Sequence, residues 1–268
     1  MVVPNRPART AVAVACLLLG MFVVACSSPS KVVNFCIDPS YPPAEFYQVT
    51  KVGTGELKRE LAGADIDVAR AVAKEADASA RFTETSFSGI FDALLNKSCD
   101  AVISMVNDTP ERRARVEFVD YLAAGQSIMS RTGSTTVTSA ADLGGKTVAV
   151  AKDTTEEQFL TAQNASSSGG SPIRILSFST ENDAIYAMQQ GAAQIYFGDT
   201  PVVVAAVAAD HGLVLGPEIV KPTPIGIALR PGDPLAGQLA TAVKTLYGNG
   251  TMGQILARWN FTRYATSP

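Results

Sequence analysis

The chain has 268 residues, a formal net charge of −3 and a single histidine, His211. This length accommodates one large or two modest domains, and the slightly acidic balance without a basic block argues against nucleic acid as a partner. One histidine excludes most zinc sites and most histidine-based catalysis.

The first 25 residues predict a secretory signal. Arg6 and Arg9 give a positive start, and residues 11–25 form an apolar run too short to span a membrane comfortably. The run ends in Val-Val-Ala before Cys26, which resembles a bacterial lipobox, so we expect a lipid on Cys26 and a polar lipidated tether over residues 26–31. An ordinary signal peptide or an N-terminal membrane anchor are the alternatives. The mature protein is then exported and anchored on the outer face of the cell membrane.

The cysteines support an exported protein. Cys16 leaves with the signal and Cys26 carries the lipid, so Cys36 and Cys99 remain, each beside an expected central strand. An even pair in an oxidising compartment predicts a disulfide. Two buried free thiols are the alternative, and a metal pair has no further ligands to support it.

Strand and helix patterns alternate in two rounds. In the first round we expect strands at 32–38, 80–85 and 101–103, helices at 65–78 and 90–95, a helix opened by Thr109, and a hairpin or surface excursion within 51–63. In the second round we expect strands at 146–151, 174–178, 193–197, 213–215 and 224–229, with helices at 156–163, 181–190 and 202–210. Two closing helices follow, at 235–249 and 252–259. The polar segment 131–136 is the expected crossing between the rounds.

This alternation predicts an α/β protein with two lobes, each a mostly parallel sheet flanked by helices. We assign residues 32–128 and 229–268 to lobe 1 and residues 129–228 to lobe 2. Two hinge crossings would join the lobes, and the cleft between them would hold a small ligand.

Familiar catalytic motifs fail their tests. Gly145-Lys146-Thr147 resembles the end of a phosphate loop, but Ala140 stands where the motif needs glycine. No G-x-S-x-G, H-E-x-x-H or C-x-x-C occurs, so hydrolase and redox functions have little support.

Arg112 breaks a local rule. Thr109, Pro110 and Glu111 suit the start of a helix, whereas a cation three residues past the N-cap opposes the helix dipole by roughly 0.3–1 kcal/mol. Its position after a strand, where α/β proteins bind ligands, predicts a site for a small anion such as a carboxylate. The alternative is a solvated basic face shared with Arg113 and Arg115.

Eight motifs occur in order between residues 32 and 259. They are Asp38-x-x-Tyr41-Pro-Pro with Glu45-Phe46, Ala64-Asp-Ile-Asp67-Val-Ala, Phe87-Ser-Gly, Cys99-Asp-Ala-Val-Ile-Ser104, Thr109-Pro-Glu-Arg112 with Phe118, Gly145-Lys-Thr-Val-Ala-Val, Gly198-Asp199 and Gly226-Ile-Ala-Leu-Arg-Pro-Gly-Asp. In this order they resemble the polar amino acid-binding family of extracytoplasmic solute-binding proteins of ABC importers, which have the type II periplasmic-binding-protein fold.

The resemblance implies a clamp for an amino acid. Arg112 falls where the family grips the α-carboxylate, and Thr154 and Thr155 fall where the second lobe offers hydroxyl and N–H groups to it. Asp199 falls where the α-ammonium binds. Asp153 replaces the family's usual glycine. The alternatives are helix capping for Thr154 and for Asp199.

The remaining implied contacts surround the ligand side chain. Tyr41 and Phe87 would sandwich it, core packing being their alternative role. The first-lobe floor, in contact with the ammonium or carboxylate, would consist of Ser104, Met105 and Asn107. The far end of a polar or cationic side chain would meet Asp38 and Glu45.

The implied function is a monomeric, cofactor-free receptor that delivers an amino acid to an ABC transporter permease. Two alternatives remain: a ligand sensor that signals to a membrane partner, and a dehydratase-type enzyme on the same fold, for which no added acid–base group is found.

Overall fold

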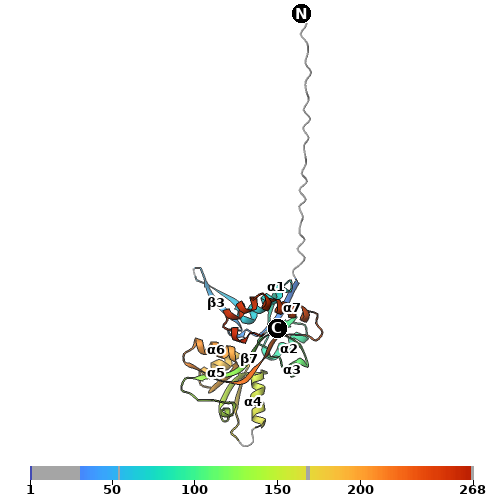
Figure 1. The fold of residues 1–268 in the computed structure, drawn as a ribbon. Helices are drawn as coiled ribbons and strands as arrows, with labels where there is room; N and C mark the ends of the chain where they lie inside the picture. Colours follow the sequence, from blue (N-terminus) through green and yellow to red (C-terminus); the bar gives the residue numbers. More distant parts are fainter. Residues whose placement is uncertain (2–30, 54, 167–169, 267–268) are drawn as a thin grey trace.

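The structure, a computed structural model, describes residues 1, 31–53, 55–166 and 170–266. The predicted signal peptide, Cys26 and residues 27–30 of the tether lie outside these ranges. Within them, no helix has the length and apolar character needed to cross a membrane. The described chain folds into two α/β lobes, one above the other in the ribbon view (Figure 1).

The upper lobe contains the first round and the end of the chain (Figure 1). Its strands β1, β5 and β6 are parallel, and its helices cover both faces. The elements are β1 (Lys31–Ile37), α1 (Ala64–Glu75), β5 (Ala78–Glu84), α2 (Ile90–Leu95), β6 (Ala101–Val102), α3 (Pro110–Arg113), α7 (Leu235–Gly248) and α8 (Thr251–Arg258). The expected excursion is an antiparallel sheet of β2 (Ser40–Tyr41), β3 (Glu45–Val52) and β4 (Glu56–Ala62).

Alternation along β1 explains how the upper lobe packs. Val33, Phe35 and Ile37 point to the face covered by α1, α7 and α8, whereas Cys36 points to the face covered by α2. Successive strand side chains point to opposite faces, and a strand buried on both faces is apolar throughout. The apolar run at 32–37 therefore becomes a central strand.

The lower lobe repeats this plan with β8 (Thr147–Ala151), β9 (Arg174–Phe178) and β10 (Ile195–Asp199) in parallel. Three helices follow these strands: α4 (Thr155–Ser166), α5 (Glu181–Gln189) and α6 (Thr200–Ala209). Val148 and Val150 pack against Leu160 of α4, and Ala149 packs on the other face with Ala184 of α5.

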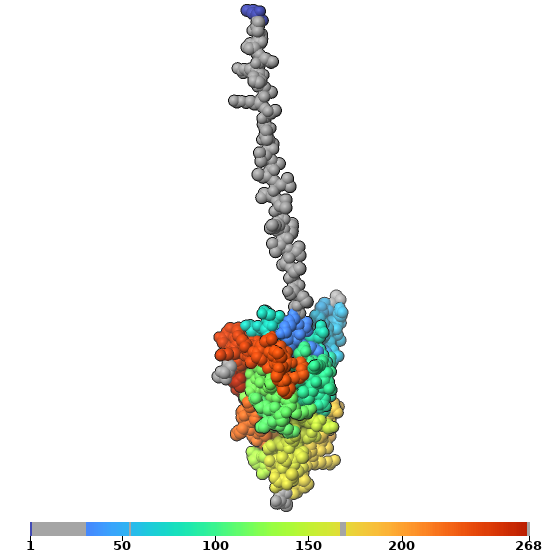
Figure 2. All heavy atoms as spheres, turned by 90° about the vertical axis from the view of Figure 1, so that its right-hand side faces the viewer, coloured from blue at the N-terminus to red at the C-terminus, as the bar shows by residue number. Residues whose placement is uncertain are grey.

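Two long antiparallel strands join the lobes: β7 (Glu117–Arg131) and β11 (Leu213–Leu229). They make one continuous eight-stranded sheet, in the order β5-β1-β6-β11-β7-β10-β8-β9. The last residues, in red, therefore return to the upper lobe, while residues near 150, in yellow, form the lower one (Figure 2).

The expected polar crossing at 131–136 is wrong. Residue 131 ends β7 at its far end, where the N–H of Thr132 donates to Gly212 O at 2.8 Å. The chain instead crosses within β7, whose Ala124 packs in the upper core and Ile128 in the lower one. A polar turn at the end of a strand and a polar linker between lobes have similar sequences. The polar segment 131–136 was therefore mistaken for the crossing between the lobes.

Gly125 lies at this crossing, opposite a stretch of β11 with repeated register shifts between Leu215 and Thr223. A Cβ atom at Gly125 would lie 2.4 Å from Glu218 Oε2 and 2.7 Å from Val220 O. The close approach of the two crossing strands therefore requires glycine here.

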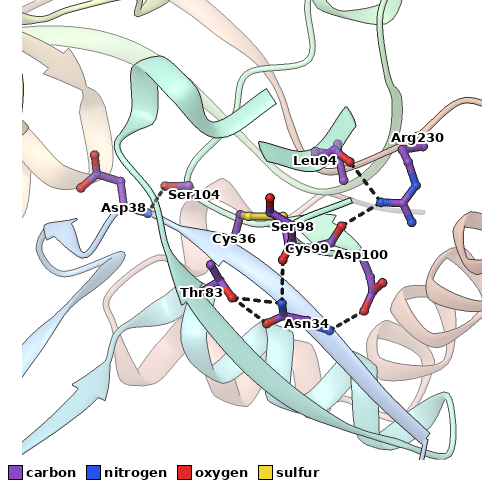
Figure 3. The surroundings of a disulfide bond; sticks show 10 residues. All are labelled: Asn34, Cys36, Asp38, Thr83, Leu94, Ser98, Cys99, Asp100, Ser104 and Arg230. Carbon is purple, nitrogen blue, oxygen red and sulfur yellow. Dashed lines mark hydrogen bonds between the residues drawn. A yellow bond between two sulfur atoms is a disulfide. The ribbon is translucent and has the colours of Figure 1, made fainter. Parts of the chain in front are cut away.

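The predicted disulfide between Cys36 and Cys99 is present, with the two Cα atoms 5.7 Å apart (Figure 3). It ties β1 to the turn that leads into β6. The same turn is held by Arg230, whose Nη1 donates to Cys99 O at 2.7 Å, and by Asp100, whose Oδ2 accepts the N–H of Asn34 at 2.9 Å. The strand end that leads to the ligand cleft is thus fixed from three sides.

Candidate functional site

A cavity lined by residues of both lobes lies between them. Its side chains follow the carboxyl ends of parallel strands in both lobes, as expected for α/β sheets. All of the predicted ligand contacts except Thr155 line it: Asp38, Tyr41, Glu45, Phe87, Ser104, Met105, Asn107, Arg112, Thr154 and Asp199. Six residues that were not predicted also line it: Ser40, Ala151, Glu156, Ser179, Thr180 and Glu181.

Arg112 is buried against the cavity, with 8% of its surface exposed. Thr109 caps the short helix α3 by accepting the N–H of Arg112 at 3.2 Å. The guanidinium lies 5.5 Å from the ring centres of both Phe87 and Phe91, and its Nη1 donates to Asn107 O at 3.0 Å. These contacts fix the plane of the guanidinium and leave other N–H donors for an anion.

Thr155 lies outside the cavity, contrary to the prediction. Its hydroxyl donates to Asn107 Oδ1 at 2.9 Å and accepts from Gln126 Nε2 at 2.6 Å. Thr155 belongs to the lower lobe and Asn107 to the upper one, so this bond holds the lobes together beside the cavity. Successive side chains of a helix point about 100° apart. Thr155 therefore points away from the cavity, although Thr154 and Glu156 on either side of it line the cavity.

Thr154 lines the cavity and also caps α4, so both of its predicted roles are compatible with the structure. Its hydroxyl accepts the N–H of Glu157 at 3.3 Å and donates to Ala151 O at 2.8 Å. Asp153 precedes it with φ of 62°, in the left-handed region where glycine is favoured. Asp153 does not line this cavity, but it lines a neighbouring hollow together with Phe87 and Arg112.

Asp199 is bonded across the cleft. The hydroxyl of Tyr41 donates to Asp199 Oδ2 at 3.3 Å and accepts the N–H of Asp199 at 2.9 Å, while Asn107 Nδ2 lies 3.5 Å from Oδ1. Burial first, and then Glu156 and Glu181, raise the pKa of Asp199 well above its usual value.

Asp38 and Ser104 shape the first-lobe floor. Asp38 Oδ2 accepts the N–H of Phe87 at 2.8 Å, and the N–H of Asp38 donates to Ser104 Oγ at 3.2 Å. Ser104 in turn donates to Glu45 Oε1 at 2.6 Å. These bonds connect the ends of β1 and β6 with the turn that carries Phe87.

Glu45 and Asp65 form a buried carboxyl pair behind this floor. Asp65 accepts the N–H of Met105 at 2.7 Å and the hydroxyl of Tyr121 at 2.5 Å. Burial first raises the pKa of Glu45 well above its usual value, and the nearby carboxyl group of Asp65 adds to the rise. Met105 has φ of 46°, and Asp65 holds this strained residue in place.

Glu156 and Glu181 are the acidic residues that sequence reasoning missed. Glu156 is buried in the first turn of α4, where its Oε2 accepts from the hydroxyl of Thr155 at 3.2 Å. Glu181 begins α5 and its Oε2 accepts from the hydroxyl of Tyr196 at 2.8 Å. Acidic side chains in the first turn of a helix are stabilised by the helix dipole. This structural role explains both glutamates without a ligand, so nothing in the sequence signals that they line a cavity.

The electrostatics of the cavity are strongly asymmetric. Among its lining residues, Arg112 carries the one cationic side chain, and burial lowers its pKa against the opposing effect of Glu156 and Asp199. Five carboxyl groups line the same cavity, on Asp38, Glu45, Glu156, Glu181 and Asp199. Within the described ranges, no group of three or more acidic, histidine or cysteine side chains is arranged to hold a metal ion.

Two α/β lobes that enclose a small polar cavity, lined by a fixed guanidinium and several acids, define a two-lobed solute-binding protein. Residues 33–262 match the family described as bacterial extracellular solute-binding proteins, family 3, and the chain belongs to that family.

Named relatives and solved structures agree with this assignment. The Escherichia coli K12 protein named ABC transporter arginine-binding protein 1 is 29% identical over 248 residues, which are 90% of this chain and 96% of that protein. The Bacillus subtilis ABC transporter glutamine-binding protein is 27% identical over 206 residues, which are 75% and 73% of the two chains. An ancestral arginine-binding protein solved with arginine has a TM-score of 0.75 and 28% identity, covering 85% of this chain and 98% of that one. The two relatives are named as amino acid-binding proteins of ABC transporters, and the solved structure as an arginine-binding protein.

Proposed function

We propose that the protein captures a cationic amino acid between its lobes and delivers it to the permease of an ABC importer. The observation that carries this proposal is the excess of acid in the cavity, where five carboxyl groups accompany one guanidinium. Arg112 binds the α-carboxylate, since a guanidinium fork donates two parallel N–H bonds to the carboxylate oxygens, and Asp199 binds the α-ammonium. The remaining acids line the space for the ligand side chain, where a positive side chain forms an ion pair with an acid that ionises on binding.

The relatives support a ligand of this class. The Escherichia coli relative is named for arginine, and the ancestral protein was solved with arginine. The Bacillus subtilis relative is named for glutamine, an uncharged amino acid of similar length. The acidic lining of this chain favours the charged ligand over the uncharged one.

Capture works by closure of the two lobes. We propose that they pivot where β7 and β11 cross, near residues 125–127 and 218–223, whereas the boundaries were expected at 128 and 229. Contacts across the cleft, such as Tyr41 to Asp199 and Thr155 to Asn107, stabilise the closed form. A ligand that binds the closed form better than the open one shifts this equilibrium and expels water.

Export and anchoring complete the proposal. A signal peptide over residues 1–25 sends the monomer out of the cytoplasm, and a lipid on Cys26 holds it at the outer face of the cell membrane. Replacement of Cys26 by alanine then releases the protein from the membrane fraction into the soluble exported fraction. If that variant stays in the membrane fraction, the lipid anchor is wrong, whereas the ligand proposal is unaffected.

Thermal-shift screening of the common amino acids, on protein that starts at Ser27, tests the ligand proposal. We expect arginine or another cationic amino acid to raise the melting temperature most. An uncharged or acidic amino acid with the largest effect would contradict the cationic ligand. No response to any amino acid would contradict amino acid capture.

A further inference from the structure

We propose that Glu181 receives the distal cation of the bound amino acid, so that the second lobe selects for side-chain charge. The inference rests on the proposed function and assigns a specificity role to a residue outside the motifs that carry the family resemblance.

Glu181 is placed at the meeting of the two lobes. It begins α5, directly after β9, and α5 packs against β2, which carries Ser40 and Tyr41 of the upper lobe. The hydroxyl of Tyr196, on the neighbouring strand β10, fixes the carboxyl group through the 2.8 Å bond to Oε2. Glu181 thereby lines the cavity from the lower lobe, close to Tyr41.

Glu181 and Arg112 line the same cavity from different lobes. Glu156 acts electrostatically on both groups, and Glu181 also acts on Asp199, the proposed site of the α-ammonium. In the proposed complex, a ligand whose α-carboxylate contacts Arg112 extends its side chain within this cavity toward Glu181.

Glu181 has no counterion of its own within the described ranges. The ion pairs there join other acids to lysine or arginine, and the one hydrogen bond to its carboxyl group comes from the neutral Tyr196. An acid that lines a cavity without a protein cation is a ready partner for a ligand cation.

The protonation of Glu181 gives this contact a measurable signature. Burial, then Glu156, raises the pKa of Glu181 to about 8, and Asp38 adds to the rise, while the Tyr196 bond lowers it. Tyr41 and Asp199 also face the carboxyl group. At pH 7 the free protein therefore holds a proton on Glu181. A cation at this position displaces the proton, which leaves to solvent as the ion pair forms.

Calorimetric titration with L-arginine and L-citrulline tests the proposal, because citrulline has nearly the same shape without the distal charge. We expect Glu181→Gln to weaken arginine binding about 10- to 100-fold, the range for a charge-assisted hydrogen bond, and to leave citrulline binding within about threefold. Wild-type arginine binding should release protons at pH 7 and strengthen from pH 6 to 8 more steeply than citrulline binding. Glu56→Gln, the same change on the exposed strand β4, should alter none of these values.

Three results would overturn the proposal. The first is that Glu181→Gln binds arginine with wild-type affinity. The second is that this variant loses affinity for arginine and citrulline equally. The third is that arginine binding releases the same number of protons in the wild type and in Glu181→Gln. A wild-type protein that binds neither these two ligands nor any other cationic amino acid would instead show that the proposed function itself is wrong, and this inference with it. Melting temperatures of all variants verify that each is folded.

Discussion

Replacement of Arg112 by alanine is the sharpest mutational test of the clamp. In the proposed complex the guanidinium makes two charge-assisted hydrogen bonds to the ligand carboxylate, each worth roughly 1.5–3 kcal/mol. Their loss costs about 3–6 kcal/mol, which corresponds to a roughly 10²- to 10⁴-fold weaker Kd. Arg112→Lys keeps the charge but not the fork, so it should lose about 10- to 100-fold.

The fold should tolerate this change. Within the described ranges Arg112 forms no ion pair, and its guanidinium makes one hydrogen bond, to Asn107 O. We therefore expect the free energy of unfolding of ligand-free Arg112→Ala to stay within about 1 kcal/mol of wild type. Arg115→Ala is the matched control, because Arg115 pairs at 2.8 Å with the exposed Asp92, and exposed pairs contribute little.

Calorimetry with L-arginine gives the affinities, and urea unfolding gives the stability. Binding by Arg112→Ala within a few-fold of wild type would refute the role of Arg112 in the clamp. A loss of affinity in Arg115→Ala as large as that in Arg112→Ala would also refute it, since the effect would then reflect general positive charge.

Three further predictions concern stability. Joint replacement of Cys36 and Cys99 by serine opens a loop spanning 63 residues of separation, so urea unfolding should show a loss of about 4 kcal/mol, and an unchanged midpoint would contradict this. At Asp153, with φ of 62°, glycine should be at least as stable as aspartate and alanine should cost about 1 kcal/mol; the reverse order in urea unfolding would contradict the conformational reason. The melting temperature of the ligand-free protein should fall as pH rises from 5 to 8, because the pKa of Glu181 is raised to about 8 in the folded state, which then binds more protons than the unfolded state. Glu181→Gln should reduce this slope, and a melting temperature that rises over this window would contradict the sign.

Much of the fold could be predicted because its signals are local. Runs such as 32–37 and 147–151 are apolar on both faces, which is typical of central parallel strands, and helical spacing follows them. The disulfide followed from the two cysteines left beside such strands. The crossing was missed because β7 is continuous through both lobes, so no break in its pattern marks the place where one core ends and the next begins.

The site could be predicted where a residue violates a local preference or lies at a strand end. Arg112 opposes its helix dipole and Asp199 ends β10, and both line the cavity. Glu156 and Glu181 could not be found this way, since acids in a first helical turn satisfy the local rules. Whether they reach the cavity depends on which way each helix faces, and that direction is set by the packing of the helix on its own sheet.

The most direct test of amino acid capture is a calorimetric comparison of L-arginine with agmatine, which lacks the α-carboxylate. If Arg112 holds that carboxylate, arginine binds and agmatine binds at least about 100-fold more weakly. Equal affinity for the two compounds would contradict the central claim, because it would show that the cavity recognises the distal cation and not the amino acid.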